Sequence, residues 1–194
     1  LFPQVSSRPI GLATGLSGYH AFQRRPTYMR LAGLALHERV KEMAKPEVKA
    51  AILSETDVAV AEPGSMANIF NLFLMAAPVI YPLADPVDYE PEMSMCLGAR
   101  AAATGDDILS VMYDFLLEQD GASMGAIMGG VDVHQSQEVI REMLVHPATV
   151  TGLSDAGAHV TLICDASMPT TQLTYWARDR RRGERIPIEF LVHK

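Results

Sequence analysis

Ala148-Thr149-Val150-Thr151-Gly152-Leu153 is a short β-rich run that directly follows a helical pattern. That pattern begins at Ser136, repeats apolar residues at helical spacing, and ends at His146-Pro147. A helix followed at once by a short buried strand is typical of a parallel sheet in an α/β protein. The opening Leu1 to Ser6 predicts a second short strand, which breaks up at Arg8-Pro9.

Other local patterns predict mostly helices joined by loops. Loop is expected from Arg8 to Pro26, a strand at Asp57 to Ala61, and a stiff connection without regular structure at Pro82 to Pro91. Helices are predicted around 36–43, after Pro46, over about 106–119 with Asp107 as a cap, from Pro169 to about Arg182, and after Pro187.

Composition excludes several classes of protein. The chain has 194 residues, 16 Lys and Arg against 23 Asp and Glu, and a net charge of −7, which argues against nucleic acid or an anionic membrane as a partner. A hydrophobic content of 48% argues against global disorder, and the length favours one domain. Cys96 and Cys164 form no C-x-x-C pair, so we expect neither a disulfide scaffold nor a structural zinc site, and a cytoplasmic location.

One long stretch without charge, Pro63 to Ala84, has the length of a membrane span. Asn68, Asn71 and three prolines interrupt it, so we expect buried core or a subunit contact in a homo-oligomer rather than a transmembrane helix. The arginine-rich run 178–185 alternates with acidic residues and is interpreted as a solvated surface.

Asp155 lies just after the predicted strand at 148–153. A carboxylate at the end of a strand can bind a metal, act as a general base, or form a turn. His159, four residues on, can reach the same pocket. Arg8 follows the first predicted strand and can pair with a substrate carboxylate or form a structural ion pair. Ser154 lies in G-x-S-x-x-G, one residue too long for a nucleophile elbow, so a serine hydrolase is a minor alternative.

Several motifs together resemble the C-terminal part of the amidohydrolase superfamily, and within it the N-acyl-D-amino-acid deacylases. The resemblance covers nearly the whole chain. Its motifs are Pro3-Gln4-Val5-x-x-Arg8-Pro9-Ile10-Gly11, Pro46-x-Val48-Lys49-Ala50-x-Ile52-Leu53, Tyr89-Glu90-Pro91, Met143-Leu144-x-His146-Pro147, Gly152-Leu153-Ser154-Asp155-Ala156-Gly157-Ala158-His159-Val160, Cys164-Asp165-Ala166-Ser167-x-Pro169-Thr170 and Trp176-x-Arg178-Asp179-Arg180.

The resemblance implies the C-terminal portion of a (β/α)8 barrel of the TIM type, an α/β fold that carries one or two zinc ions. Leu1 to Ser6 would be strand seven and Thr149 to Leu153 strand eight. Residues 1–26 would hold strand seven and its loop, 27–147 an inserted helical subregion, and 148–194 strand eight with the following helices. All 194 residues would form one partial domain.

The same resemblance implies a metal-dependent amide hydrolase. Asp155 would contact the metal, take a proton from the attacking water and pass it to the leaving amine, while Arg8 and His159 would bind substrate. The family's H-x-H, cysteine and later histidine ligands would lie upstream of Leu1, and Cys96 is interpreted as a small buried residue instead.

We therefore expect a barrel fragment that is inactive alone. Its substrate would be a small-molecule N-acyl-D-amino acid or a related amide. The sequence lacks the family's His-Pro-Arg stretch after the aspartate, so another amide stays open. A non-catalytic binding or assembly module is the alternative from a different class.

Overall fold

A computed structural model describes the chain except for residues 61, 63–64, 66–68, 130–135, 155–161 and 164. Its α-helices are α1 (Pro26–Leu31), α2 (Leu36–Met43), α3 (Pro46–Ser54), α4 (Ile69–Met75), α5 (Leu97–Thr104), α6 (Ile108–Leu117), α7 (Glu138–Val145), α8 (Met168–Thr174) and α9 (Ile188–His193). The 3-10 helices are η2 (Ala77–Val79), η3 (Met93–Met95) and η4 (Glu118–Gly121), and η5 (Tyr175–Asp179) is a π-helix. The strands are β1 (Gln4–Val5), β2 (Ile10–Gly15), β3 (Ile80–Pro82), β4 (Met124–Gly129) and β5 (Val150–Thr151).

The chain is a mixed α/β protein, as the sequence predicts. β1 pairs with β5 in parallel, with Gln4 opposite Val150 and Val5 opposite Thr151. Both short strands predicted from the sequence, within 1–6 and 148–153, are present, and the structure shows that they pair with each other. The remaining described strands form a three-stranded sheet in the order β2-β4-β3, in which β3 and β4 are antiparallel.

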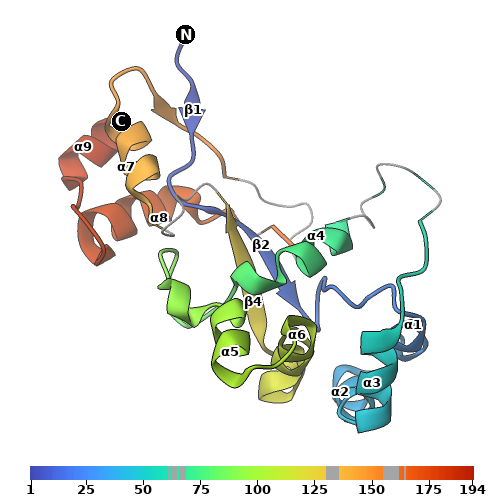
Figure 1. Cartoon of the computed structure of the whole chain (residues 1–194). Coiled ribbons are helices and arrows are strands. Elements are labelled where there is room, and N and C mark those ends of the chain that lie inside the picture. Colours follow the sequence, from blue (N-terminus) through green and yellow to red (C-terminus); the bar gives the residue numbers. More distant parts are fainter. Residues whose placement is uncertain (61, 63–64, 66–68, 130–135, 155–161, 164) are drawn as a thin grey trace. The chain divides into compact units, whose positions relative to one another are not determined.

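Contacts divide the chain into two compact units (Figure 1). The first unit comprises Leu1–Leu12, Ala84–Met93 and Met128–Lys194, and the second comprises Ala13–Leu83 and Ser94–Ile127. The first unit is thus assembled from three separate stretches of sequence.

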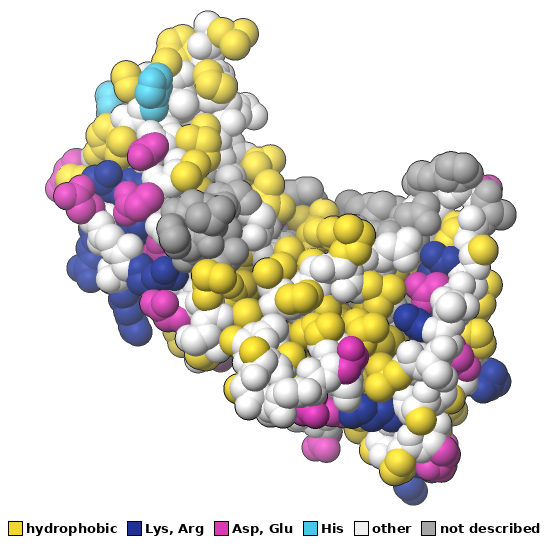
Figure 2. Space-filling view, in the orientation of Figure 1, with side chains coloured by type: hydrophobic (Ala, Val, Ile, Leu, Met, Phe, Trp, Pro, Cys, Tyr) yellow, Lys and Arg dark blue, Asp and Glu magenta, His cyan; other side chains and the backbone are white. Residues whose placement is uncertain are grey.

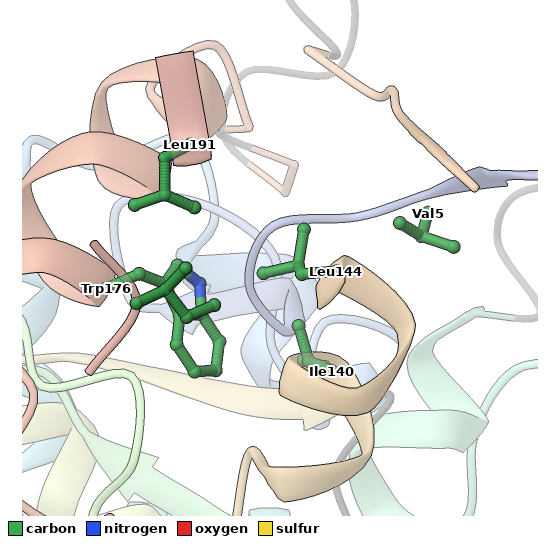
Figure 3. Packing of buried hydrophobic residues seen from close by; sticks show 6 residues of the cluster. Val5, Ile140, Leu144, Trp176 and Leu191 are labelled. Carbon is green, nitrogen blue, oxygen red and sulfur yellow. The ribbon is translucent and has the colours of Figure 1, made fainter. Parts of the chain in front are cut away.

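The core of the first unit gathers around Trp176, which is fully buried. Figure 3 shows its ring among side chains from β1, α7 and α9. The cluster consists of Val5, Ile140, Leu144, Trp176, Ile186 and Leu191. Burial of these apolar side chains holds β1 against α7.

The second unit packs helices around buried aromatic rings. The Tyr113 hydroxyl on α6 donates to the Met43 carbonyl at 2.8 Å, and the Phe22 ring lies 5.6 Å from the Tyr113 ring. The cap of α6 is also as predicted, because Asp107 Oδ1 accepts from the amides of Leu109 and Ser110 at 2.9 and 3.3 Å.

Part of the apolar stretch Pro63 to Ala84 lies in the buried core of the second unit. Phe73, Ala77, Ile80 and Tyr81 are buried there. No helix in the described parts of the chain is both long enough and apolar enough to cross a membrane.

Two local predictions are wrong. The expected loop after Arg8 contains strand β2, whose glycine at 15 lets the backbone come close to Ser123, since an added Cβ would lie 3.0 Å from the Ser123 carbonyl oxygen. Residues 57–60 form no strand, and the Val58 amide donates to the Arg24 carbonyl at 2.9 Å. The helix predicted from Pro169 to about Arg182 is present, as α8 followed by the π-helix η5, and it ends at Asp179, since Arg180 has φ of −59° and ψ of 130°.

Candidate functional site

A cleft of about 220 Å³ lies in the first unit, where β1 and β5 end. It is lined by Ser7, Thr151, Gly152, Leu153, Ser154, Pro169 and Gln172. Ser7 follows β1, residues 152–154 follow β5, and Pro169 and Gln172 belong to α8. Because the two strands are parallel, their carboxyl ends meet at one edge, which is where ligands bind in open α/β sheets.

Asp155 and His159, the two residues predicted from the loop after β5, lie outside the described residues. Ser154 is exposed, lines the cleft and donates from Oγ to the Ala166 carbonyl at 3.4 Å. The residue before Asp155 in the chain is therefore at the cleft, while the roles of Asp155 and His159 stay predictions.

Leu153, two residues before Asp155, has a left-handed backbone with φ of 69°. This conformation costs a non-glycine residue about 1–2 kcal/mol. Strained backbone of this kind concentrates at ligand sites and active sites, where the surrounding structure holds it in place. The strain at Leu153 thus marks the end of β5 as a candidate site independently of Asp155.

Arg8 is buried beside the cleft, with its Nη1 2.8 Å from Asp165 Oδ1. The guanidinium also donates to the Pro9 carbonyl at 3.0 Å and to Ser167 Oγ at 3.3 Å, and lies 4.4 Å from the centre of the Tyr89 ring. This arrangement is the structural ion pair that the sequence left open as one alternative. A contact between Arg8 and a substrate stays a prediction.

Ser7 is a cleft residue that the sequence analysis did not single out. Its Oγ donates to the Met168 carbonyl at 2.8 Å, and its carbonyl accepts from Trp176 Nε1 at 2.6 Å. Trp176 lies on the π-helix η5, and π-helical turns are frequent at functional sites. The position of Ser7 directly after a predicted strand was the only sequence signal for it.

A buried network fixes the segment 89–92 to the end of η5. Glu90 accepts from the Gln137 amide at 2.7 Å, from the Tyr175 hydroxyl, and from Arg180 Nη2 at 3.3 Å. Arg180 also stacks on the Trp176 ring at 4.8 Å. Burial, with the bond to Glu90, raises the pKa of the Tyr175 hydroxyl, which stays protonated. For Arg180 the expectation of a solvated surface is therefore wrong.

The described residues do not by themselves fit a zinc ion. Nowhere in the described ranges do three His, Cys, Asp or Glu side chains come together as a metal group would require. Cys96 is buried at the N-cap of α5, where its Sγ accepts from the Ala99 amide at 3.4 Å, in line with its interpretation as a small buried residue. His146 caps the end of α7, and its Nδ1 accepts from the Ala148 amide at 3.1 Å.

Comparison with known proteins adds no family assignment. The chain matches no protein-family model, no curated protein and no solved structure. What is known of the site thus consists of its geometry: a small cleft at the carboxyl ends of two parallel strands, a strained leucine at its rim, and a buried ion pair beside it.

Proposed function

We propose that this chain supplies part of the active site of a metal-dependent amidohydrolase, with N-acyl-D-amino acids or related amides as substrates. The observation that supports this is the parallel pairing of β1 with β5, which puts a cleft and the start of the Asp155 loop at one edge. In this proposal β1 and β5 are strands seven and eight of a (β/α)8 barrel, with catalytic groups at the carboxyl ends of the strands.

Asp155 is the proposed acid and base. Its carboxylate takes a proton from the attacking water and then gives it to the leaving amine. Zinc would supply activation of that water when bound, and the resemblance assigns most of its ligands to sequence upstream of Leu1. The described residues do not form a group of side chains that could bind a metal. The roles proposed for this chain are therefore proton transfer by Asp155 and substrate binding in the cleft.

The decisive experiment begins with the coding sequence upstream of Leu1, where we expect H-x-H, a cysteine and two separated histidines. The protein including that segment is then assayed for release of acetate from N-acetyl-D-amino acids. Replacing Asp155 with Asn should lower turnover by about 10²–10⁴-fold, because proton transfer is lost. The matched control is Asp106→Asn, at an exposed aspartate in the second unit, and it should leave turnover unchanged.

Two results would contradict the proposal. Equal turnover by Asp155→Asn and the unchanged protein would remove Asp155 from the chemistry. Hydrolysis by the 194-residue chain alone, lost on Asp155→Ala, would show that these residues suffice and that the fragment interpretation is wrong.

A binding or assembly module is the second candidate, favoured by apolar exposure in the second unit. Met75 is 82% exposed at the end of α4, and Leu72 and Val79 are exposed nearby in the sequence. Figure 2 shows hydrophobic side chains gathered over the region of α4 and α6. This candidate differs from the first in requiring self-association or another bound partner, which sedimentation of the purified chain measures.

A further inference from the structure

Three buried polar side chains of the second unit each have an atom without a hydrogen-bond partner. They are Thr14 on β2, His20 shortly after that strand, and Ser123 directly before β4, and each of these residues is at most 3% exposed. Thr14 Oγ1, His20 Nε2 and Ser123 Oγ have no partner among the residues that the structure describes. Such atoms are few in folded proteins, because leaving a buried donor or acceptor unpaired costs free energy.

The three residues belong to one local part of the fold. Gly15 follows Thr14, and a Cβ added to Gly15 would lie 3.0 Å from the Ser123 carbonyl oxygen, so β2 meets the start of β4 here. A tight turn then brings the chain back, since the Gly15 amide donates to the Tyr19 carbonyl at 3.1 Å, and His20 is the next residue. We call this part, with residues 14, 15, 19, 20 and 123, the β2–β4 junction.

The ring of His20 contributes a hydrogen-bond donor to the junction. The Phe22 amide donates to His20 Nδ1 at 3.2 Å, so a neutral ring has its proton on Nε2. The ring is neutral because burial, with the nearby Arg39 charge, lowers the pKa of His20 to about 3. The Tyr28 ring packs edge-on against it, with the ring centroids 4.5 Å apart. His20 Nε2–H is therefore a buried donor in need of an acceptor.

Thr14 and Ser123 each contribute a hydroxyl, which can donate one hydrogen and accept others. Elsewhere in the second unit such hydroxyls donate to backbone carbonyls, as Thr104 Oγ1 does to Arg100 at 3.3 Å and Ser54 Oγ to Ala51 at 3.0 Å. A ligand of the junction must therefore accept from an N–H group and also pair with hydroxyls. Water does both, and buried water typically makes about three hydrogen bonds to polar groups that have no protein partner.

We infer that the β2–β4 junction binds internal water, held by Thr14 Oγ1, His20 Nε2 and Ser123 Oγ. The water accepts from His20 Nε2–H and pairs with the two hydroxyls. It exchanges more slowly than surface hydration, because the residues that hold it are buried. These residues belong to the second unit, and none of them has a role in the proposed amide hydrolysis, so the inference does not depend on that function.

The test is oxygen-17 relaxation dispersion of water in a solution of the 194-residue chain. The amplitude of the dispersion is proportional to the number of long-lived bound waters, and exchange of hydroxyl hydrogens does not contribute to it. The variant combines Thr14→Val with Ser123→Ala, which removes both hydroxyls and keeps apolar side chains in their place. We expect this double variant to lose the amplitude of at least about one water molecule.

The chain offers a matched control for these two substitutions. Thr104→Val combined with Ser54→Ala deletes the same chemical groups in the same unit, but from exposed residues whose hydroxyls already donate to carbonyls. We expect the control to leave the dispersion amplitude unchanged. For both double variants, ¹H–¹⁵N spectra that are unchanged away from the substituted residues report an intact fold.

A second measurement uses the unchanged protein, so it does not depend on the folding of a variant. With ¹⁵N-labelled histidine, the His20 Nε2–H signal should show a cross-peak to water that has opposite signs in laboratory-frame and rotating-frame NOE spectra. Equal amplitudes in the unchanged protein and the Thr14→Val, Ser123→Ala variant would overturn the inference. Equal losses in the two double variants, or a His20 signal without this cross-peak, would overturn it as well.

Discussion

The buried pair between Arg8 and Asp165 makes a quantitative prediction about stability. Asp165→Asn leaves the guanidinium in a site where the Arg8 side chain is 2% exposed and the Asp165 side chain 4% exposed. Removing one partner of such a pair costs about 3–5 kcal/mol, because the buried guanidinium loses the carboxylate that lies 2.8 Å from it. Since Asn still offers an acceptor oxygen, we expect about 3 kcal/mol, which moves a urea midpoint by about 1–3 M.

The assay is urea unfolding followed by tryptophan fluorescence. Trp176 is the single tryptophan of the chain and lies in the first unit, where its Nε1 bonds to the Ser7 carbonyl next to Arg8. Its emission therefore follows the unit that contains the ion pair. The matched control is Glu92→Gln, which breaks the Arg182–Glu92 pair of the same unit, in which Glu92 is 66% exposed, and should cost below about 1 kcal/mol.

A double variant separates the charge from the packing. Arg8→Met combined with Asp165→Leu removes both charges, so it should be more stable than Asp165→Asn alone. A loss in Asp165→Asn no larger than in Glu92→Gln would refute the reasoning. So would a double variant whose loss equals the sum of the losses measured for Arg8→Met and Asp165→Leu separately, since this would mean that the two groups do not interact.

Two further predictions concern the second unit, and both are measured by urea unfolding with far-UV circular dichroism. Burial, with the nearby Arg39 charge, lowers the pKa of His20 to about 3, so the unfolded chain takes up a proton below pH 6.5 that the folded chain does not, and stability falls as pH drops from 6.5 toward 3. This contribution reaches about 2 kcal/mol at pH 5, and His20→Gln should remove it; an identical pH dependence in the variant would contradict the assignment. Asp107→Ala should cost about 1 kcal/mol through loss of the α6 cap, whereas Asp106→Ala, at an exposed neighbour, should cost less, and equal losses would rule out the cap.

Elements whose signals are local were predictable from the sequence. Pro46 opens α3, Asp107 caps α6, and α7 ends before His146-Pro147, each as the pattern indicates. In every case the decisive contact lies within a few residues along the chain, so a short window of sequence contains it.

Elements that depend on distant partners were not predictable in this way. Strand β2 contains two glycines, so its sequence predicts a loop. It forms a strand by pairing with β4, which lies more than a hundred residues later in the chain. Arg180 lies in a charged run typical of a surface, but its partner Glu90 is 90 residues away in sequence and buried. No periodicity near Arg180 contains that information.

The candidate site likewise has features that local sequence patterns predict and features that depend on distant residues. The position of the strand ends, and hence of the cleft edge, followed from the local patterns around β1 and β5. The pairing of Arg8 with Asp165 and the contacts of Ser7 with Met168 and Trp176 span more than 150 residues and came only from the structure.

The split of the first unit into three stretches has a consequence for biosynthesis. Val5 leaves the ribosome about 145 residues before its partner Thr151. At about 5–20 residues per second, β1 waits on the order of ten seconds for β5. During this interval most of the second unit is already synthesised, so its helices can form before the first unit has a core. Synonymous codons that slow translation between these strands would lengthen the time before β5 can pair with β1.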